Sequence, residues 1–211
     1  AAEGLHLMVG FNRRFSPHAK EARTFFSSRS NPLVMLYRIN AGRIPADHWV
    51  QDPDVGGGRV IGEVCHFVDY MHALCASPPT SVFASRVGRH SSGITEDQCS
   101  LSLTFGDGSI GTIIYTAEGS SALQKEHFEA HADGMSLVMS DFMETRTYHN
   151  GKSALFKTAK RDKGFAQEMA QFVQAIEQGL PPVIPFEQID AVTRACLLAV
   201  RSLSSGVAYP L

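Results

Sequence analysis

Short strand-forming stretches fill the middle of the chain, and they limit what it can fold into more than any other feature. Between about 80 and 158, alternating and β-branched stretches follow one another with only turns between them. Gly106-Asp107-Gly108 is a strong hairpin signal. Such short connections make most neighbouring strands antiparallel, because parallel pairs need long crossovers. The expected strands are 81–87, 98–105, 109–116, 126–132, 136–140, 145–148 and 154–158.

Helical periodicity flanks this region on both sides. Ser16-Pro17 looks like an N-cap followed by proline at the first helical position. Apolar residues at helical spacing then recur before Pro78-Pro79, before Gly179 and before Gly206. The expected helices are 17–30, 60–75, 165–176 and 189–203, and further strands are expected at 5–11 and 33–40.

This order of elements predicts an α+β fold: an open, mostly antiparallel β-sheet with helices packed on one face. The other face must then be polar or covered by a partner subunit. We expect a homo-oligomer through this open face, which would otherwise expose Ile113, Tyr115 or their alternate neighbours.

Composition narrows the functional class. The 211 residues carry 19 Lys+Arg and 21 Asp+Glu, a net charge of -2, so neither nucleic acid nor an anionic membrane is an expected partner. No apolar stretch approaches a membrane span and no signal peptide opens the chain. The 4 cysteines form no CxxC pair and are expected to be buried free thiols. These features predict a soluble, cytoplasmic protein.

The densest polar cluster lies around the second expected helix. Gly56, Gly57, Gly58 and Gly62 do not have the GxGxxG spacing and follow a loop, so we reject a cofactor phosphate site there.

Glu63, His66 and Asp69 follow at i, i+3 and i+6. A histidine flanked by carboxylates can serve as a general acid or base. A capped helix with a partly solvated polar stripe is the alternative interpretation.

His127, Glu129 and His131 point to one face of an expected strand and raise the possibility of a metal site. Their order does not match HExxH. We favour a solvent or subunit face of the sheet as the interpretation and predict no metal site.

Several segments together resemble one enzyme family. They are VGFNRRFSP at 9–17, GGGRVIGEVCHFVD at 56–69, DKGF at 162–165 and PPVIP at 181–185. In this order they resemble the C-terminal part of the Gfo/Idh/MocA oxidoreductases, the relatives of glucose–fructose oxidoreductase and inositol dehydrogenase. The amino-acid sequence of residues 62–69 is most similar to that of members fused behind a zinc-alcohol-dehydrogenase-like domain.

The resemblance implies an oxidoreductase that moves hydride between NAD or NADP and a sugar, polyol or related carbohydrate derivative. Family members place a Rossmann domain first and the sheet domain second, with the active site between them. We therefore expect 1–17 to be the last Rossmann strand and linker, and 18–211 to be the substrate-binding and oligomerisation domain. The Rossmann domain is expected to be absent, which would leave this chain inactive alone and without tightly bound cofactor. A non-catalytic ligand-binding or dimerisation module is the alternative.

The resemblance also suggests roles for single residues. His66 falls on the family's catalytic histidine. Many members carry an aspartate at the position of Gly62, and Glu63 is the expected replacement, although one residue rotates a helical side chain by about 100°. The family's Glu-Lys-Pro lysine has no counterpart here. The remaining predictions are Arg13, Arg43, Trp49, Arg59 and Asp69 for substrate, Asn12 and Arg14 for cofactor, and none for metal.

Overall fold

A single open sheet organises the molecule. The computed structural model describes residues 5–45, 47–52, 54–87 and 97–211. Within these residues the sheet has nine strands in the order β8-β7-β6-β5-β1-β4-β3-β2-β9. Every neighbouring pair is antiparallel except β1 and β4. The strands are β1 Val34–Asn40, β2 Pro79–Arg86, β3 Gln98–Phe105, β4 Ile110–Thr116, β5 Glu126–Ala132, β6 Met135–Ser140, β7 Glu144–His149, β8 Lys152–Lys157 and β9 Tyr209–Pro210.

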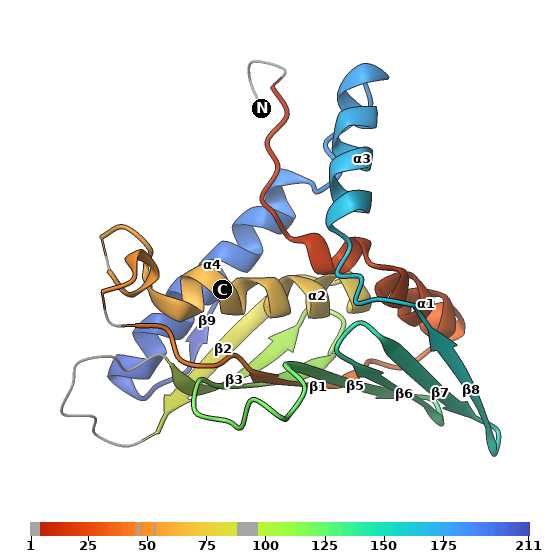
Figure 1. Ribbon diagram of the computed structural model, residues 1–211, viewed down its shortest axis with the longest axis horizontal. Helices are drawn as coiled ribbons and strands as arrows, with labels where there is room; N and C mark the ends of the chain where they lie inside the picture. The colour runs from red at the N-terminus through yellow and green to blue at the C-terminus, as the bar shows by residue number, and fades with distance from the viewer. Residues whose placement is uncertain (1–4, 46, 53, 88–96) are drawn as a thin grey trace.

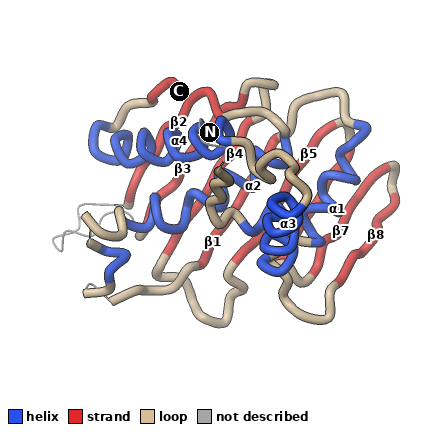
Figure 2. The backbone as a smooth tube through the Cα atoms, turned by 90° about the horizontal axis from the view of Figure 1, so that it is seen from above, coloured by secondary structure: helices blue, strands red, loops and turns tan. Residues whose placement is uncertain are grey.

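The helices lie on one side of this sheet and leave the other side bare (Figure 1). Seen from above, α2 and α4 cross the strands side by side (Figure 2). A π-helical turn, η4, runs directly into α2, and no described helix has the length and apolar content to cross a membrane. The helical elements are η1 Asn12–Phe15, α1 Pro17–Phe25, η2 Phe26–Ser28, η3 Trp49–Gln51, η4 Val60–Val64, α2 Cys65–Cys75, α3 Phe165–Glu177 and α4 Phe186–Ser205. The predicted α+β architecture is confirmed.

Local sequence signals explain where these elements begin. The Ser16 hydroxyl accepts a hydrogen bond of 3.0 Å from the Ala19 amide, and Pro17 stands at the first position of α1, as the sequence indicated. β3 and β5 have the predicted bounds. The four cysteines are free thiols, and only Cys65 is not fully buried.

The core forms where strand alternation meets α2. Tyr37 of β1 packs against Phe67 of α2 and Phe128 of β5, with ring centroids 4.8 and 5.2 Å apart. Ile113 and Tyr115 also face the helices and are buried. Their exposure on the open face, one of the expected alternatives, is therefore ruled out.

Two expectations fail for the same reason, a missing packing partner. Residues 5–11 form no strand, because no other described strand lies beside them. The apolar stripe of α3 does not enter the core: Phe165 is 63% and Met169 52% exposed, since α3 stands away from the sheet (Figure 1). Spacing predicted the helix correctly and the burial of its stripe wrongly. β9 was not predicted, because two residues carry no periodic pattern.

Gly164 provides a stability test of the junction between η1 and α3. Its φ is +87°, and an added Cβ would lie 2.4 Å from the Asn12 oxygen and 2.5 Å from the Ser16 nitrogen. Because both neighbours are backbone atoms, we expect Gly164→Ala to lower the free energy of unfolding by about 3 kcal/mol. The control Gly134→Ala has φ +71° but nothing within 4 Å, and should cost about 1 kcal/mol. Equal losses in urea unfolding would contradict the close contact.

Candidate active site

A fully buried carboxylate, Glu126, lies at the centre of the candidate site. Arg13 holds it through two hydrogen bonds of 2.9 Å, and the Tyr37 hydroxyl donates a third of 2.7 Å. The Lys163 ammonium also contacts it. Burial alone would raise the pKa of Glu126, but the bonds and charges of Arg13 and Lys163 lower it to about 2. The carboxylate is therefore ionised at neutral pH.

His66, the predicted catalytic residue, lies close to this charged group. His66 is the second residue of α2. Its ring packs edge-on against the ring of Phe11, with the ring centroids 6.0 Å apart. Burial and the charge of Arg13 lower the pKa of His66 to about 4, against opposing effects of Glu63 and Glu126. Its Nδ1 is buried with no hydrogen-bond partner among the described residues. At neutral pH the imidazole is uncharged and can accept a proton.

Glu63, the predicted helper of His66, is tied to other groups. Lys125 lies 2.6 Å from one of its oxygens, and the Tyr115 hydroxyl donates to the other at 2.5 Å. Arg59 is 3.1 Å from that second oxygen and also donates to Tyr115. Burial would raise the pKa of Glu63, but the Lys125 and Tyr115 hydrogen bonds lower it. Glu63 is thus an ionised anchor for β4 and the segment before β5.

The π-helical turn explains why Glu63 faces these partners. Residues 60–64 form η4, and the Cys65 amide bonds the Val60 carbonyl five residues back. A π turn holds an extra residue compared with an α turn and is frequent at functional sites. The rotation of about 100° per residue that holds in an α-helix therefore does not apply across residues 60–64.

Two predicted ligand-binding residues instead form a buried ion pair. Arg14 contacts both oxygens of Asp69, with Nε 3.0 Å from Oδ2 and Nη2 2.5 Å from Oδ1. Burial outweighs the Arg14 charge and raises the pKa of Asp69 to about 6. Arg14 also donates to Gln188 at 2.7 Å. Both side chains are occupied within the chain.

The other predicted residues divide by exposure. Asn12 is fully buried and donates to the Lys163 carbonyl at 2.8 Å, and Arg59 is 1% exposed. Arg43 and Trp49 lie on the surface of the 41–58 loop, where Arg43 pairs with Glu118 at 2.7 Å. The structure therefore brings together Arg13, Arg59, Glu63 and His66, and leaves Arg43 and Trp49 at the outer edge.

A cavity of about 400 Å³ lies next to this group. Lys125, the partner of Glu63, lines it together with residues after β1 and before β5. Arg161 and Asp141 close another side of it. The cavity offers room for a polar small molecule.

Sequence reasoning missed Glu126, Lys163, Tyr115 and Lys125 as site residues. A signal for Glu126 existed: it alternates with Phe128 and Ala130, so it had to share their buried side of β5. A carboxylate on an apolar face requires a cationic partner. Lys163 stands within the DKGF stretch, but nothing in its spacing connects it to residue 126.

The described residues hold no cluster of metal-ligating side chains of the kind that the alternative metal interpretation requires. His127 Nε2 lies 2.8 Å from Glu129, and His131 Nε2 lies 3.7 Å from it. No set of three potential ligands around one point occurs in the described part of the chain. The three side chains lie on the open face of β5.

Solved structures share this fold over the whole chain. Aldose-aldose oxidoreductase from Caulobacter crescentus has a TM-score of 0.81 with 17% identity, covering 100% of this chain and 65% of that one. A putative myo-inositol dehydrogenase from Sinorhizobium meliloti 1021 has a TM-score of 0.73 with 20% identity, covering 97% and 65%. At such identities the likeness establishes the fold alone.

Sequence comparison establishes the family. The GFO/IDH/MocA C-terminal domain matches residues 32–137, and the chain belongs to this oxidoreductase family. An uncharacterized oxidoreductase, YrbE of Bacillus subtilis, is 28% identical over 114 residues, which cover 52% of this chain and 33% of the relative. The chain thus spans about a third of this curated relative and about two thirds of the solved structures.

Removing the charge of Glu126 should reveal its role. Glu126→Gln leaves Arg13 and Lys163 buried without their counter-charge, so we expect a loss of about 3–5 kcal/mol in the free energy of unfolding. Because Glu126 raises the pKa of His66, the variant should also lower that pKa further, as followed by NMR of the imidazole.

Glu129→Gln provides the matched control on the same strand. Glu129 faces the open side and is partly exposed, so its loss should cost less than about 1 kcal/mol. Equal effects of the two variants would contradict a central role for Glu126.

Proposed function

We propose that this chain is the substrate-binding and oligomerisation domain of an NAD(P)-dependent oxidoreductase acting on a sugar, polyol or related carbohydrate. The observation that carries the proposal is a neutral, half-buried His66 set among Arg13, Lys163, Glu63 and Glu126. A base that is uncharged at pH 7 and surrounded by fixed charges suits proton removal from a hydroxyl group.

Each residue of the group has a separate task in this proposal. His66 accepts the hydroxyl proton as the carbon is oxidised, or returns it in the reverse direction. Lys125 lines the neighbouring cavity and is available to bind substrate hydroxyls, while Glu63 holds Lys125 in place. Glu126 and Arg13 form an ion pair, and their charges shift the pKa of His66 in opposite directions.

We assign no dinucleotide site to the described residues of this chain. Asn12 is fully buried and Arg14 is paired with Asp69, so we do not assign the nicotinamide to them. We assign the nicotinamide, which would supply the hydride step, to a nucleotide-binding domain that precedes this one in a longer parent protein. GenD2 from gentamicin A biosynthesis, in complex with NAD, and levoglucosan dehydrogenase, in complex with NADH and levoglucosan, have the same fold with TM-scores of 0.77 and 0.79.

The exposed side of α3 fits such a preceding domain. Three residues of its apolar stripe, Phe165, Met169 and Ile176, are at least half exposed. Residues 5–11 rise beside α3 in Figure 1, where the His6 ring lies 6.4 Å from that of Phe172. We propose that the preceding domain covers this surface, because a stripe of this kind would otherwise stay in water.

A non-catalytic ligand-binding or dimerisation module remains the second candidate. Gly62 favours it, because Gly62 stands where many family members carry an aspartate. Turnover of the intact parent separates the two candidates. Reduction of NAD or NADP in the presence of a panel of sugars and polyols supports the oxidoreductase. If no sugar or polyol in the panel leads to reduction of either cofactor, the result supports the non-catalytic module.

His66→Ala in the parent tests the assignment of the base. We expect kcat to fall by about 10²- to 10⁴-fold, with cofactor affinity unchanged, because only the proton acceptor is lost. His149→Ala, at the exposed end of β7, is the matched control and should retain full turnover. Unchanged kcat in His66→Ala would contradict the role of His66.

The open face supports the oligomerisation part of the proposal. Its central row pairs Ile114 of β4 with Arg38 of β1 and Ser100 of β3. Apolar side chains occur along it between serines and threonines, so the face is neither fully polar nor covered. The exposed members are Val34 52%, Phe83 39%, Ile110 48%, Ile114 43% and Leu155 43%.

A charge at the centre of this face should prevent self-association. Ile114→Lys places a second cation beside Arg38, and we expect light scattering to show a smaller species than for the unchanged chain. Leu197→Lys on the outer side of α4 is the control, because Leu197 is 52% exposed but far from the open face. A chain that is monomeric before the substitution would contradict the proposed oligomer.

A further inference from the structure

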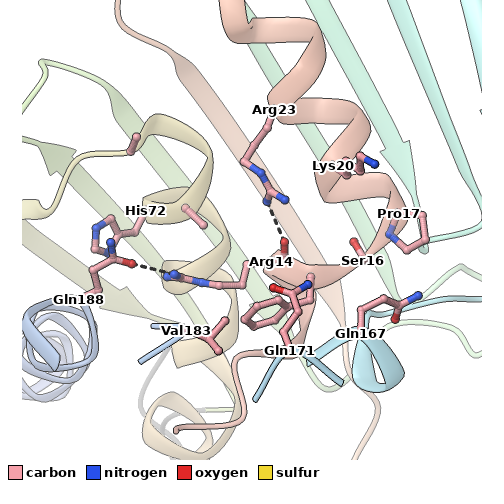
Figure 3. Close-up of a pocket in the computed structure, with 13 residues that line it drawn as sticks. Arg14, Ser16, Pro17, Lys20, Arg23, His72, Gln167, Gln171, Val183 and Gln188 are labelled. Carbon is pink, nitrogen blue, oxygen red and sulfur yellow. Dashed lines mark hydrogen bonds between the residues drawn. The ribbon is translucent and has the colours of Figure 1, made fainter. Parts of the chain in front are cut away.

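A second cavity, separate from the candidate active site, lies where several helices meet. It has a volume of about 670 Å³ and is bordered by the start of α1, the end of α2, one side of α3 and the first turn of α4 (Figure 3). Two adjacent arginines separate the two sites: Arg13 turns toward Glu126, and Arg14 lines this cavity. Its size is in the range of small-molecule pockets.

The lining carries positive charge without matching acids. Arg14, Lys20 and Arg23 line the cavity, and no aspartate or glutamate is among the described lining residues. Arg14 is neutralised by Asp69 behind it. Outside the lining, Asp162 accepts a hydrogen bond of 3.0 Å from Gln167, and Glu168 is buried, with its pKa raised by burial and by Asp69. Among the lining residues, Lys20 and Arg23 leave an excess of positive charge.

Lys20 and Arg23 both have N–H donors that are not used in hydrogen bonds within the described part of the chain. Arg23 uses one nitrogen on the Arg14 carbonyl at 2.7 Å, and Figure 3 shows its side chain reaching toward Arg14. The Lys20 ammonium forms no hydrogen bond or ion pair with any part of the chain that the structure describes. Burial first, and the like charge of Arg14 in addition, lower the pKa of Arg23. A bound anion would offset both effects.

Uncharged polar groups complete the lining. His72 is 4% exposed and its Nδ1 has no partner among the described residues. Burial and the Arg14 charge lower its pKa to about 4, so the ring is neutral. Gln167 and Gln171 enter from the side of α3 opposite its exposed apolar stripe, and Gln167 Oε1 is buried without a partner. Such groups recognise hydroxyls.

Helix geometry adds to the attraction for an anion. Ser16 and Pro17, at the N-terminus of α1, border the cavity, so the positive end of this helix points at it. The C-terminal end of α2 has the opposite polarity, but Arg29 bonds the Cys75 carbonyl there at 2.9 Å. The cations and the N-terminal end of α1 therefore make the electrostatic potential in the cavity positive.

We propose that this cavity binds a small phosphate ester that carries hydroxyl groups. Lys20 and Arg23 hold the phosphate at the start of α1. His72, Gln167 and Gln171 contact the hydroxyl-bearing part. Because His66 and Asp69 share one helix with His72, an occupied cavity would be connected to the candidate active site through α2.

Binding to the 211-residue chain tests the proposal directly. We expect glycerol 3-phosphate, titrated at low ionic strength, to give saturable NMR shifts at the amides around Lys20 and His72. Inorganic phosphate should bind there more weakly, and glycerol should not bind. Absence of saturable binding would overturn the proposal. Equal affinities for phosphate and the ester would contradict the contacts with hydroxyls.

Substitutions locate the binding in this cavity. Lys20→Gln removes an exposed charge without breaking a described contact, and should weaken binding about fivefold while leaving the thermal midpoint unchanged. Arg23→Gln should weaken it at least as much. Lys152→Gln, on the exposed hairpin between β7 and β8, is the matched control. Affinity that falls no more in Lys20→Gln than in Lys152→Gln would overturn the assignment.

Discussion

The rest of the structure depends on the buried charge of Glu126. Its partners come from three places in the chain: Arg13 from η1, Tyr37 from β1 and Lys163 from the segment before α3. A carboxylate in the interior is stable only when it is paired and hydrogen-bonded, so these segments must meet at one point. This requirement places η1 above the centre of the sheet. It also places His66, which packs against Phe11, beside the fixed charges.

A second buried pair makes η1 a junction between two sites. Arg13 and Arg14 are adjacent and point apart, one to Glu126 and the other to Asp69. Because Asp69 is one turn beyond His66 on α2, the second pair fixes the rotation of that helix. The burial of Asp69 is costly, as its raised pKa indicates, so the pair favours one arrangement of η1 and α2 more than it adds stability.

Most of the fold could be predicted from the sequence, and part of the site could not. Alternation defined β3 and β5 to the residue, because one side of each strand is buried. Residues 5–11 and the α3 stripe failed where burial depends on a neighbour that spacing does not contain. His66 and Glu63 were predicted as site residues through local pattern and resemblance, and they stay predictions. Lys125 and Lys163 act through contacts more than 35 residues apart in sequence, for which a single chain gives no signal.

Glu63 shows most clearly why spacing alone misleads at the candidate site. Counted as an α-helix, residues 63 and 66 are close neighbours on one face. The π turn at 60–64 changes that count, and the carboxylate instead joins Lys125, Tyr115 and Arg59. Glu63 still raises the pKa of His66, but through its charge and not through a hydrogen bond to the ring. A carboxylate that is ionised and fixed in this way can favour a protonated imidazole without accepting the proton itself, which is what a general base needs from its neighbour.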